Sequence, residues 1–342
     1  MNLYPLKFQP ILKTVIWGGT EIRPFKGMPA TKELIGESWE VSAVPGHESI
    51  VANGPLAGSN LRALTADYPK EMLGEKLGSA ASPEFPLLIK IIDAQQNLSL
   101  QVHPDDSLAR QRHNCFGKNE MWHIISTKPG AKILAGMKKE VNKDEYTSLV
   151  ESGDILDYVA QHDSHPGDTF YIPAGRVHGI GAGNLLIEVQ QSSDITYRIF
   201  DYNRRDANGN TRELHTEQAL DAIDFKVYDD YRTQAGKPAA AAPGCEYSLL
   251  VESPFFVVKK INLATKAPTK IESSNSFVSL TCIEGTACCR VRTVEAGDDE
   301  AQETTFTTTI QKGESALIPA SCVSSASISG NATLIYATPA QA

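Results

Sequence analysis

The sequence predicts a mainly β protein with two related β-domains and a few helices outside the sheets. Three observations carry this prediction: the apolar runs are short, turn-forming residues separate them, and one motif recurs on both sides of a linker. Many short apolar runs bounded by Gly, Pro, Asn and Asp are typical of β-sandwiches and barrels. The length of 342 residues also fits two domains, at about 150 residues each.

Strands are expected at the short apolar runs, for example at 169–172, 185–189 and 255–258. Helices are expected at about 61–75, 144–161 and 216–222. In the second of these, apolar residues recur at helical spacing, at Tyr146, Leu149 and Val150 and then at Leu156 and Val159.

A linker is expected at 233–244, where Gly236-Lys237-Pro238 precedes four alanines and a Pro-Gly pair. This stretch is poor in residues that pack and rich in turn formers. We therefore assign residues 1–232 to a first domain and residues 245–342 to a second. Within the second domain, the acidic stretch 295–305 is expected to form an exposed hairpin loop.

A repeat spans the linker. Residues 167–178 and 313–324 share a glycine, an Ile-Pro-Ala triplet and a valine at the same spacing, and His178 is replaced by Ser324. A weaker upstream match aligns 122–130 with 277–285. It sets Glu120 against Asn275, so only the first domain keeps residues able to bind a metal.

Composition and charge argue against several classes of partner. The net charge is −9, from 32 Lys and Arg against 41 Asp and Glu, whereas nucleic-acid grooves and anionic membranes require a basic surplus. No apolar run approaches the roughly 20 residues of a membrane span, and the N-terminus lacks the pattern of a signal peptide. The six cysteines form no CxxC pair. We expect a cytoplasmic protein with reduced thiols, no nucleic-acid partner and no membrane association.

One group of residues is suited to bind a metal ion. Gln101 and His103 are two residues apart, as are Lys118 and Glu120, so each pair projects from one face of a strand. His178 follows a Pro-Ala-Gly turn that ends a strand. Two imidazoles and a carboxylate, with the amide oxygen of Gln101 as a candidate fourth ligand, suit Zn²⁺ and leave coordination positions open to a substrate.

These residues also carry a resemblance. The spacing Gly-x5-Pro-x-Gly-x2-His at 167–178 resembles the second conserved motif of cupins. The segments 86–94, 98–106 and 118–122 resemble type I mannose-6-phosphate isomerases of the short bacterial form. Matching pieces also occur at 16–19, 37–40 and 190–194. The resemblance covers about 6–225 and continues more faintly beyond it, which implies two cupin-like jelly-roll domains.

The resemblance implies a function. It implies zinc-dependent interconversion of mannose 6-phosphate and fructose 6-phosphate by proton transfer through a cis-enediol, with one Zn²⁺ per chain and a phosphosugar substrate. The family's zinc ligands fall on Gln101, His103, Glu120 and His178, which is the set reached from strand geometry. An amide oxygen is a weak ligand, so Gln101 has the alternative of facing the substrate. The family's essential arginine falls on Arg198 and its acidic pocket residue on Glu188. Its pocket lysine falls on Lys118, and the serine that it associates with the substrate phosphate falls on Ser99.

Several alternatives stay open. Either Lys118 or Glu188 is expected to be the base, with Arg198 as the electrostatic stabiliser. Each of the three residues also has an alternative without a catalytic role. Glu188 is then a structural carboxylate and Lys118 a solvated loop lysine. Arg198 is then an ion-pair partner of Asp194 or Asp201. The remaining histidines of this region are expected not to be ligands: His113, His123, His162 and His165. Competing functions are another metal-dependent cupin enzyme, such as a dioxygenase, and a non-catalytic sugar-binding cupin.

Overall fold

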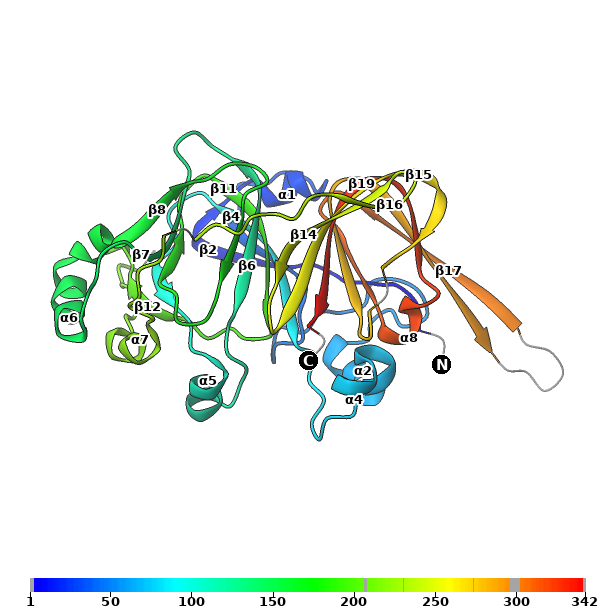
Figure 1. Cartoon of the computed structure of the whole chain (residues 1–342), viewed down its shortest axis with the longest axis horizontal. Coiled ribbons are helices and arrows are strands. Elements are labelled where there is room, and N and C mark those ends of the chain that lie inside the picture. Colours follow the sequence, from blue (N-terminus) through cyan, green and yellow to red (C-terminus); the bar gives the residue numbers. More distant parts are fainter. Residues whose placement is uncertain (1–2, 206–207, 230, 273, 296–301, 341–342) are drawn as a thin grey trace.

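The computed structural model describes residues 3–340 except 206–207, 230, 273 and 296–301. Two β units lie side by side, with short helices on their outer surfaces (Figure 1). The prediction of a mainly β fold with helices outside the sheets is therefore confirmed. No helix in the described part of the chain is long and apolar enough to cross a membrane.

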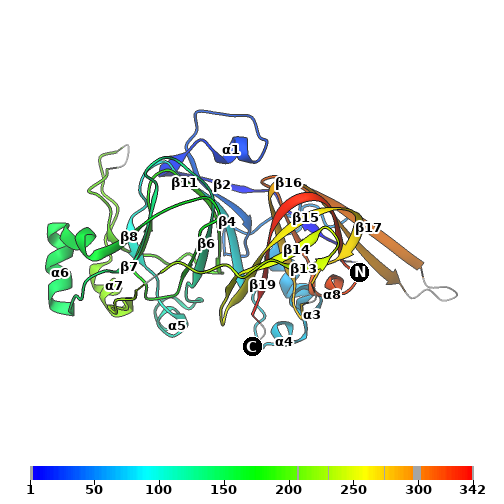
Figure 2. The ribbon, with the colours of Figure 1, turned by 45° about the horizontal axis from the view of Figure 1, so that its top comes forward.

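The first unit is a sandwich of two antiparallel sheets, whose walls face each other in Figure 2. The six-stranded sheet has, in spatial order, β2 (Ile11–Gly19), β3 (Ile35–Val41), β4 (Leu87–Ala94), β11 (Asn184–Gln191), β6 (Glu120–Thr127) and β9 (Thr169–Ile172). The five-stranded sheet has β12 (Tyr197–Phe200), β5 (Leu100–Val102), β10 (His178–Ile180), β7 (Lys132–Met137) and β8 (Val159–Asp163).

The six-stranded sheet is covered on both faces. On β4, Ile92 and Ala94 pack between the two sheets beside Trp122, whereas Leu87 and Ile89 pack against the second unit. Side chains alternate between the faces of a strand, so burial of both faces produces a continuous apolar run. This explains why residues 86–92 are apolar except for one lysine.

The second unit is built on one eight-stranded sheet. Its spatial order is β1 (Leu6–Lys7), β18 (Ser315–Ile318), β16 (Val278–Glu295), β19 (Ser327–Pro339), β15 (Phe256–Lys270), β14 (Cys245–Glu252) and β13 (Ala239–Ala242), and β17 (Gln302–Gln311) pairs with β16. Two strands thus come from outside 245–342: β1 from the N-terminus, and β13 from the alanines of the predicted linker. The predicted acidic loop at 295–305 lies mostly outside the described residues.

The helix predictions are partly confirmed. Helix α7 (Thr216–Ala222) has the predicted bounds. The helix predicted at 61–75 is three short helices, α2 (Leu61–Asp67), α3 (Pro69–Leu73) and α4 (Glu75–Gly78), because Pro69 begins a new helix and Gly74 has a φ of +88°.

The helix predicted at 144–161 is too long. Helix α6 (Lys143–Ser152) ends at Gly153, whose φ is +83°, and a 3₁₀ turn, η1 (Asp154–Tyr158), leads into β8. Three further helices were not predicted: α1 (Ile22–Phe25), α5 (Asp106–His113) and α8 (Ala320–Val323).

The repeat appears as two equivalent hairpins. The N–H of Gly167 donates to the carbonyl of Ile124 at 2.8 Å, and the N–H of Gly313 donates to the carbonyl of Cys282 at 2.8 Å. Both glycines have a positive φ, +94° and +83°, which explains their recurrence at this turn. Ser324, at the position of His178, caps the short helix α8 and is exposed.

The predicted upstream match is wrong by three residues. Glu120 pairs with Ile172 in the first hairpin, and Val278 pairs with Ile318 in the second. Since the two isoleucines are equivalent in the repeat, Glu120 corresponds to Val278 and not to Asn275. The sequence match aligned Gly130 with Gly285, but Gly130 follows β6 whereas Gly285 lies inside β16.

Candidate active site

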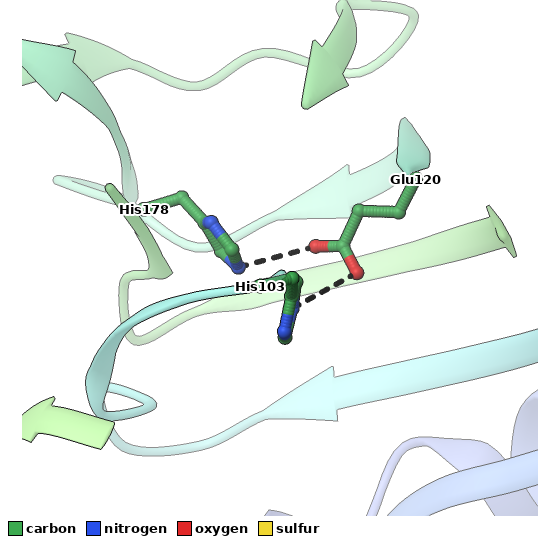
Figure 3. Close-up of side chains that lie close together, drawn as sticks. All are labelled: His103, Glu120 and His178. Carbon is green, nitrogen blue, oxygen red and sulfur yellow. Dashed lines mark ion pairs between the residues drawn. The ribbon is translucent and has the colours of Figure 1, made fainter. Parts of the chain in front are cut away.

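Three of the four predicted metal ligands come together inside the first unit. His103 follows β5, Glu120 begins β6 and His178 begins β10. Their candidate ligand atoms all lie within 4.8 Å of one another, and all three residues are buried. Figure 3 shows the two imidazoles turned toward the Glu120 carboxylate. Because Glu120 belongs to one sheet and the histidines to the other, the group bridges the sandwich.

Backbone carbonyls fix the orientation of both imidazoles. Nδ1 of His103 donates to the carbonyl of Ile195 at 2.9 Å, and Nδ1 of His178 donates to the carbonyl of Arg176 at 2.7 Å. The Nε2 atoms consequently face Glu120, at 3.4 Å and 3.3 Å from its carboxylate oxygens. Histidines that bind metals are commonly held through the other ring nitrogen in this way.

The protonation states suit a metal site. Burial lowers the pKa of His103 to about 3 and also lowers the pKa of His178. Burial alone raises the pKa of Glu120, but nearby Lys118 and the two histidines lower it well below its usual range. Neutral imidazoles and an ionised carboxylate are the forms that bind a metal.

The local contacts also suit a cation. Nζ of Lys118 lies 2.8 Å from Nε2 of His103 and 2.6 Å from Oε2 of Glu120, so a positive charge already sits against two of the ligand atoms. Oε1 of Glu120 is buried and has no hydrogen-bond partner among the described residues. A buried, unpartnered carboxylate oxygen beside two imidazoles fits a divalent cation with nitrogen and oxygen ligands.

Gln101 lies beside this group. Its amide nitrogen is 3.2 Å from Nε2 of His178, and its amide oxygen accepts from Oγ of Ser99 at 3.3 Å. In this orientation the amide donates to the imidazole, so coordination by Gln101 requires the opposite amide orientation. Ser99 and Gln101 both line the cavity next to the metal group.

That cavity has a volume of about 330 Å³ and collects the remaining predicted site residues. Lys118, Glu188 and Arg198 line it, with Trp17 and Trp122 as aromatic walls. Lys118 is only 4% exposed, which contradicts the alternative of a solvated loop lysine.

Glu188 stands in the middle of the six-stranded sheet. Its Oε2 accepts from the indole N–H of Trp122 at 2.9 Å, and its Oε1 lies 3.1 Å from Nζ of Lys90. Burial raises the pKa of Glu188, although Lys90 opposes the shift. A carboxyl group whose pKa is raised in a polar cavity is a candidate for general acid and base chemistry.

Arg198 is held by backbone groups. Its Nη1 donates to the carbonyl of Glu213 at 2.8 Å, and its buried Nε has no hydrogen-bond partner in the part of the chain that the structure describes. Burial lowers the pKa of Arg198, as does the charge of nearby Arg212. Among the described residues, Arg198 pairs with neither Asp194 nor Asp201; Asp201 pairs with Arg204 and Arg212.

Among the charged residues that line the cavity, the sequence analysis gave no role to three: Glu37, Lys90 and Arg212. Lys90 left a signal, because it is the lone charge in the apolar run 86–92 and a buried charge requires a partner. Glu37 lies in the segment 37–40 that resembles the family, but nothing in that segment marks its carboxylate as a cavity residue. Arg212 left no signal, since an arginine in a polar loop is an ordinary surface feature.

Comparison with known proteins gives a consistent result. Residues 5–146 match the family described as phosphomannose isomerase type I, catalytic domain. The chain is 36% identical to mannose-6-phosphate isomerase of Streptococcus mutans over 287 residues, covering 82% of this chain and 85% of that protein. It is 36% identical to mannose-6-phosphate isomerase ManA of Bacillus subtilis, covering 83% and 87% of the two chains.

A solved structure extends the likeness to the whole chain. The crystal structure of mannose 6-phosphate isomerase from Bacillus subtilis superposes with a TM-score of 0.83 at 32% sequence identity. The superposition covers 97% of this chain and 99% of that one, so the likeness includes both β units.

Proposed function

The chain belongs to the type I phosphomannose isomerase family, and we propose that it interconverts mannose 6-phosphate and fructose 6-phosphate with one bound Zn²⁺. One observation supports this most: His103, Glu120 and His178 meet beside a cavity lined by a lysine, a carboxylate and an arginine. This set of groups matches the needs of a sugar-phosphate isomerase.

The proposed reaction moves two protons. A base removes the proton from C2 of mannose 6-phosphate and returns it to C1, while a second proton passes from O2 to O1. The intermediate is a cis-enediol, and negative charge develops on the two oxygens. Lys118 and Glu188 are the candidate bases. Arg198, whose buried Nε has no hydrogen-bond partner, is the proposed stabiliser of the developing charge.

His103, Glu120 and His178 are the residues proposed to hold the zinc ion, with Gln101 as a fourth ligand or a substrate contact. When bound, Zn²⁺ supplies Lewis acidity toward the substrate oxygens. Ser99, which hydrogen-bonds Gln101, is proposed to contact the substrate phosphate. We also retain the expectation of a cytoplasmic protein.

The test is a coupled assay that follows formation of fructose 6-phosphate from mannose 6-phosphate, before and after chelation. We expect turnover, loss of turnover in chelator, and recovery when zinc is restored. Binding of the sugar phosphate without turnover in the zinc-loaded protein would overturn the proposal in favour of a non-catalytic sugar-binding cupin. Oxygen uptake with iron would instead indicate a dioxygenase-like cupin.

A further inference from the structure

A row of four side chains crosses the six-stranded sheet on its cavity face. In register, Trp39 of β3 pairs with Lys90 of β4, Lys90 pairs with Glu188 of β11, and Glu188 pairs with Trp122 of β6. Directly paired residues on neighbouring strands are close enough for their side chains to interact. The two tryptophans therefore bracket a buried lysine and a buried glutamate.

A second carboxylate joins this row from the side. Glu37, two residues before Trp39 on the same strand face, has Oε2 at 3.8 Å from Nζ of Lys90. The indole N–H of Trp39 donates to that Oε2 at 2.6 Å, just as the indole of Trp122 holds Glu188. Two indole-held carboxylates thus flank a single ammonium group.

The ammonium of Lys90 is shared unequally. It lies 3.1 Å from Oε1 of Glu188 and 3.8 Å from Glu37, and its side chain is only 5% exposed. Oε1 of Glu188 has this ion-pair contact but accepts no hydrogen bond from the described residues. Lys90 therefore offsets part of the negative charge of Glu188, and Oε1 of Glu188 can still accept a hydrogen bond from another donor.

We propose that Glu37 is a positioning residue: by sharing Lys90, it keeps the ammonium from pairing fully with Glu188 and so leaves Glu188 basic and open toward the substrate. The inference deepens the proposed function, on which it rests. A lone lysine–glutamate pair would be neutral and would direct the ammonium at Oε1 of Glu188. With Glu37 present, two carboxylates share the ammonium of Lys90. Asp194 also acts on Lys90, and the ammonium of Lys13, 3.5 Å from the centroid of the Trp39 ring, acts on Glu37.

The charged groups around Glu188 support this direction of effect. Burial raises its pKa; Lys90 on β4 and Lys118 before β6 lower it, whereas Glu120 on β6 and Glu37 on β3 raise it. Removing the charge of Glu37 takes away one like charge and frees Lys90 to pair with Glu188. Both changes make Glu188 a weaker base.

The experiment is the pH profile of kcat/KM for the zinc-loaded enzyme carrying Glu37→Gln. Glutamine keeps the size of the side chain and an oxygen for the Trp39 indole, but removes the charge. We expect the acid limb to move to lower pH, with zinc content unchanged. An acid limb that stays in place or moves to higher pH would overturn the proposal.

A second variant keeps the test decisive if Glu37→Gln does not fold. Lys90→Gln removes the shared ammonium, so the acid limb should move to higher pH; an unchanged or lowered limb would overturn the proposal. The matched control is Glu40→Gln on the same strand, since Glu40 is buried but pairs with Lys26 at 2.6 Å. This control should lower the unfolding temperature and leave the acid limb in place.

The two proposals fail differently. If the wild-type enzyme does not isomerise mannose 6-phosphate, the proposed function fails. If the wild type is active and the variants at Glu37 and Lys90 share its acid limb, only the role of Glu37 fails.

Discussion

At the scale of single residues, the metal group depends on imidazoles that are buried, neutral and held by backbone carbonyls. His178 pairs in register with Gln101 on β5 and faces Glu120 from β10. Removing this imidazole leaves one histidine, one carboxylate and the weak candidate ligand Gln101, so one of the two strong nitrogen ligands of the proposed zinc site is lost.

We therefore predict that His178→Ala loses both bound zinc and isomerase activity. Zinc content is measured by atomic absorption on the purified protein, and turnover by the coupled assay. The control is Ser324→Ala, at the equivalent position of the repeat, where the side chain is exposed and zinc and activity should stay at wild-type levels. Full activity in metal-free His178→Ala protein would refute the zinc assignment.

A second prediction at this scale concerns Arg198. Arg198→Ala should lower kcat by about a hundredfold, since loss of one group that stabilises transition-state charge typically costs this much. Zinc content should not change, because the guanidinium is held by the Glu213 carbonyl and not by the metal group. Wild-type turnover in this variant would show that Arg198 does not stabilise the transition state and has a structural role instead.

The residues with a strong local pattern were predictable, and those defined by packing were not. Gln101, His103 and Glu120 follow strand spacing and His178 follows a turn motif, but these local patterns do not bring the segments together; the family resemblance was needed to propose them as one metal group. Lys90 stands out as the lone charge in an apolar run, but its pairing with Glu188 and Glu37 depends on the register of β3, β4 and β11, which no local pattern specifies.

At the scale of elements, helix α6 shows how local chemistry sets a boundary. The side chain of Asn142 accepts from the N–H of Glu145, and the Glu145 side chain accepts from the N–H of Asn142, which is a capping box. Gly153 then ends the helix with a positive φ. These signals explain why the predicted start was accurate and the predicted end was eight or nine residues too late.

The capping box gives a prediction for stability. Asn142→Ala should lower the free energy of unfolding by about 1 kcal/mol, because it removes the acceptor for the first helical N–H groups. Urea unfolding followed by circular dichroism measures the change. Because Asn142 is exposed and the buried α6 residues Tyr146 and Val150 are unchanged, kcat should not change. A loss of activity without a loss of stability would contradict this assignment.

At the scale of the whole molecule, the two β units share one hairpin design and one hydrophobic cluster where they meet. Met121 and Val189 of the six-stranded sheet pack in the same cluster as Phe256 and Leu280 of the second unit. The sequence predicted the repeat but not this contact, because burial of both sheet faces depends on how the units are placed. The division into domains at 232 and 245 remains a proposal.

This contact contains a buried histidine. His123 lies between Met121 and Ile125 on β6, is 3% exposed and has Nδ1 at 3.0 Å from Oγ1 of Thr169. Burial lowers its pKa to about 4; the charge of Lys260 on the second unit also lowers it, and Asp168 opposes the shift. The imidazole is thus neutral in the folded protein at pH 5, whereas in an unfolded chain it becomes charged below about pH 6.5.

The sign of the pH dependence follows. Between pH 6.5 and about 4 the unfolded chain binds a proton at His123 that the folded chain does not, so the free energy of unfolding falls as the pH falls. For this one group the loss between pH 7 and pH 5 is about 2 kcal/mol. His123→Asn keeps a polar partner for Thr169 and removes the titration, so its loss of stability over the same range should be smaller by about that amount.

Urea unfolding at the two pH values measures the difference, and Ser324→Ala, which removes no titratable group, should keep the wild-type dependence. If the free energy of unfolding falls equally in His123→Asn and in wild type between pH 7 and pH 5, protonation of His123 does not cause the acid destabilisation.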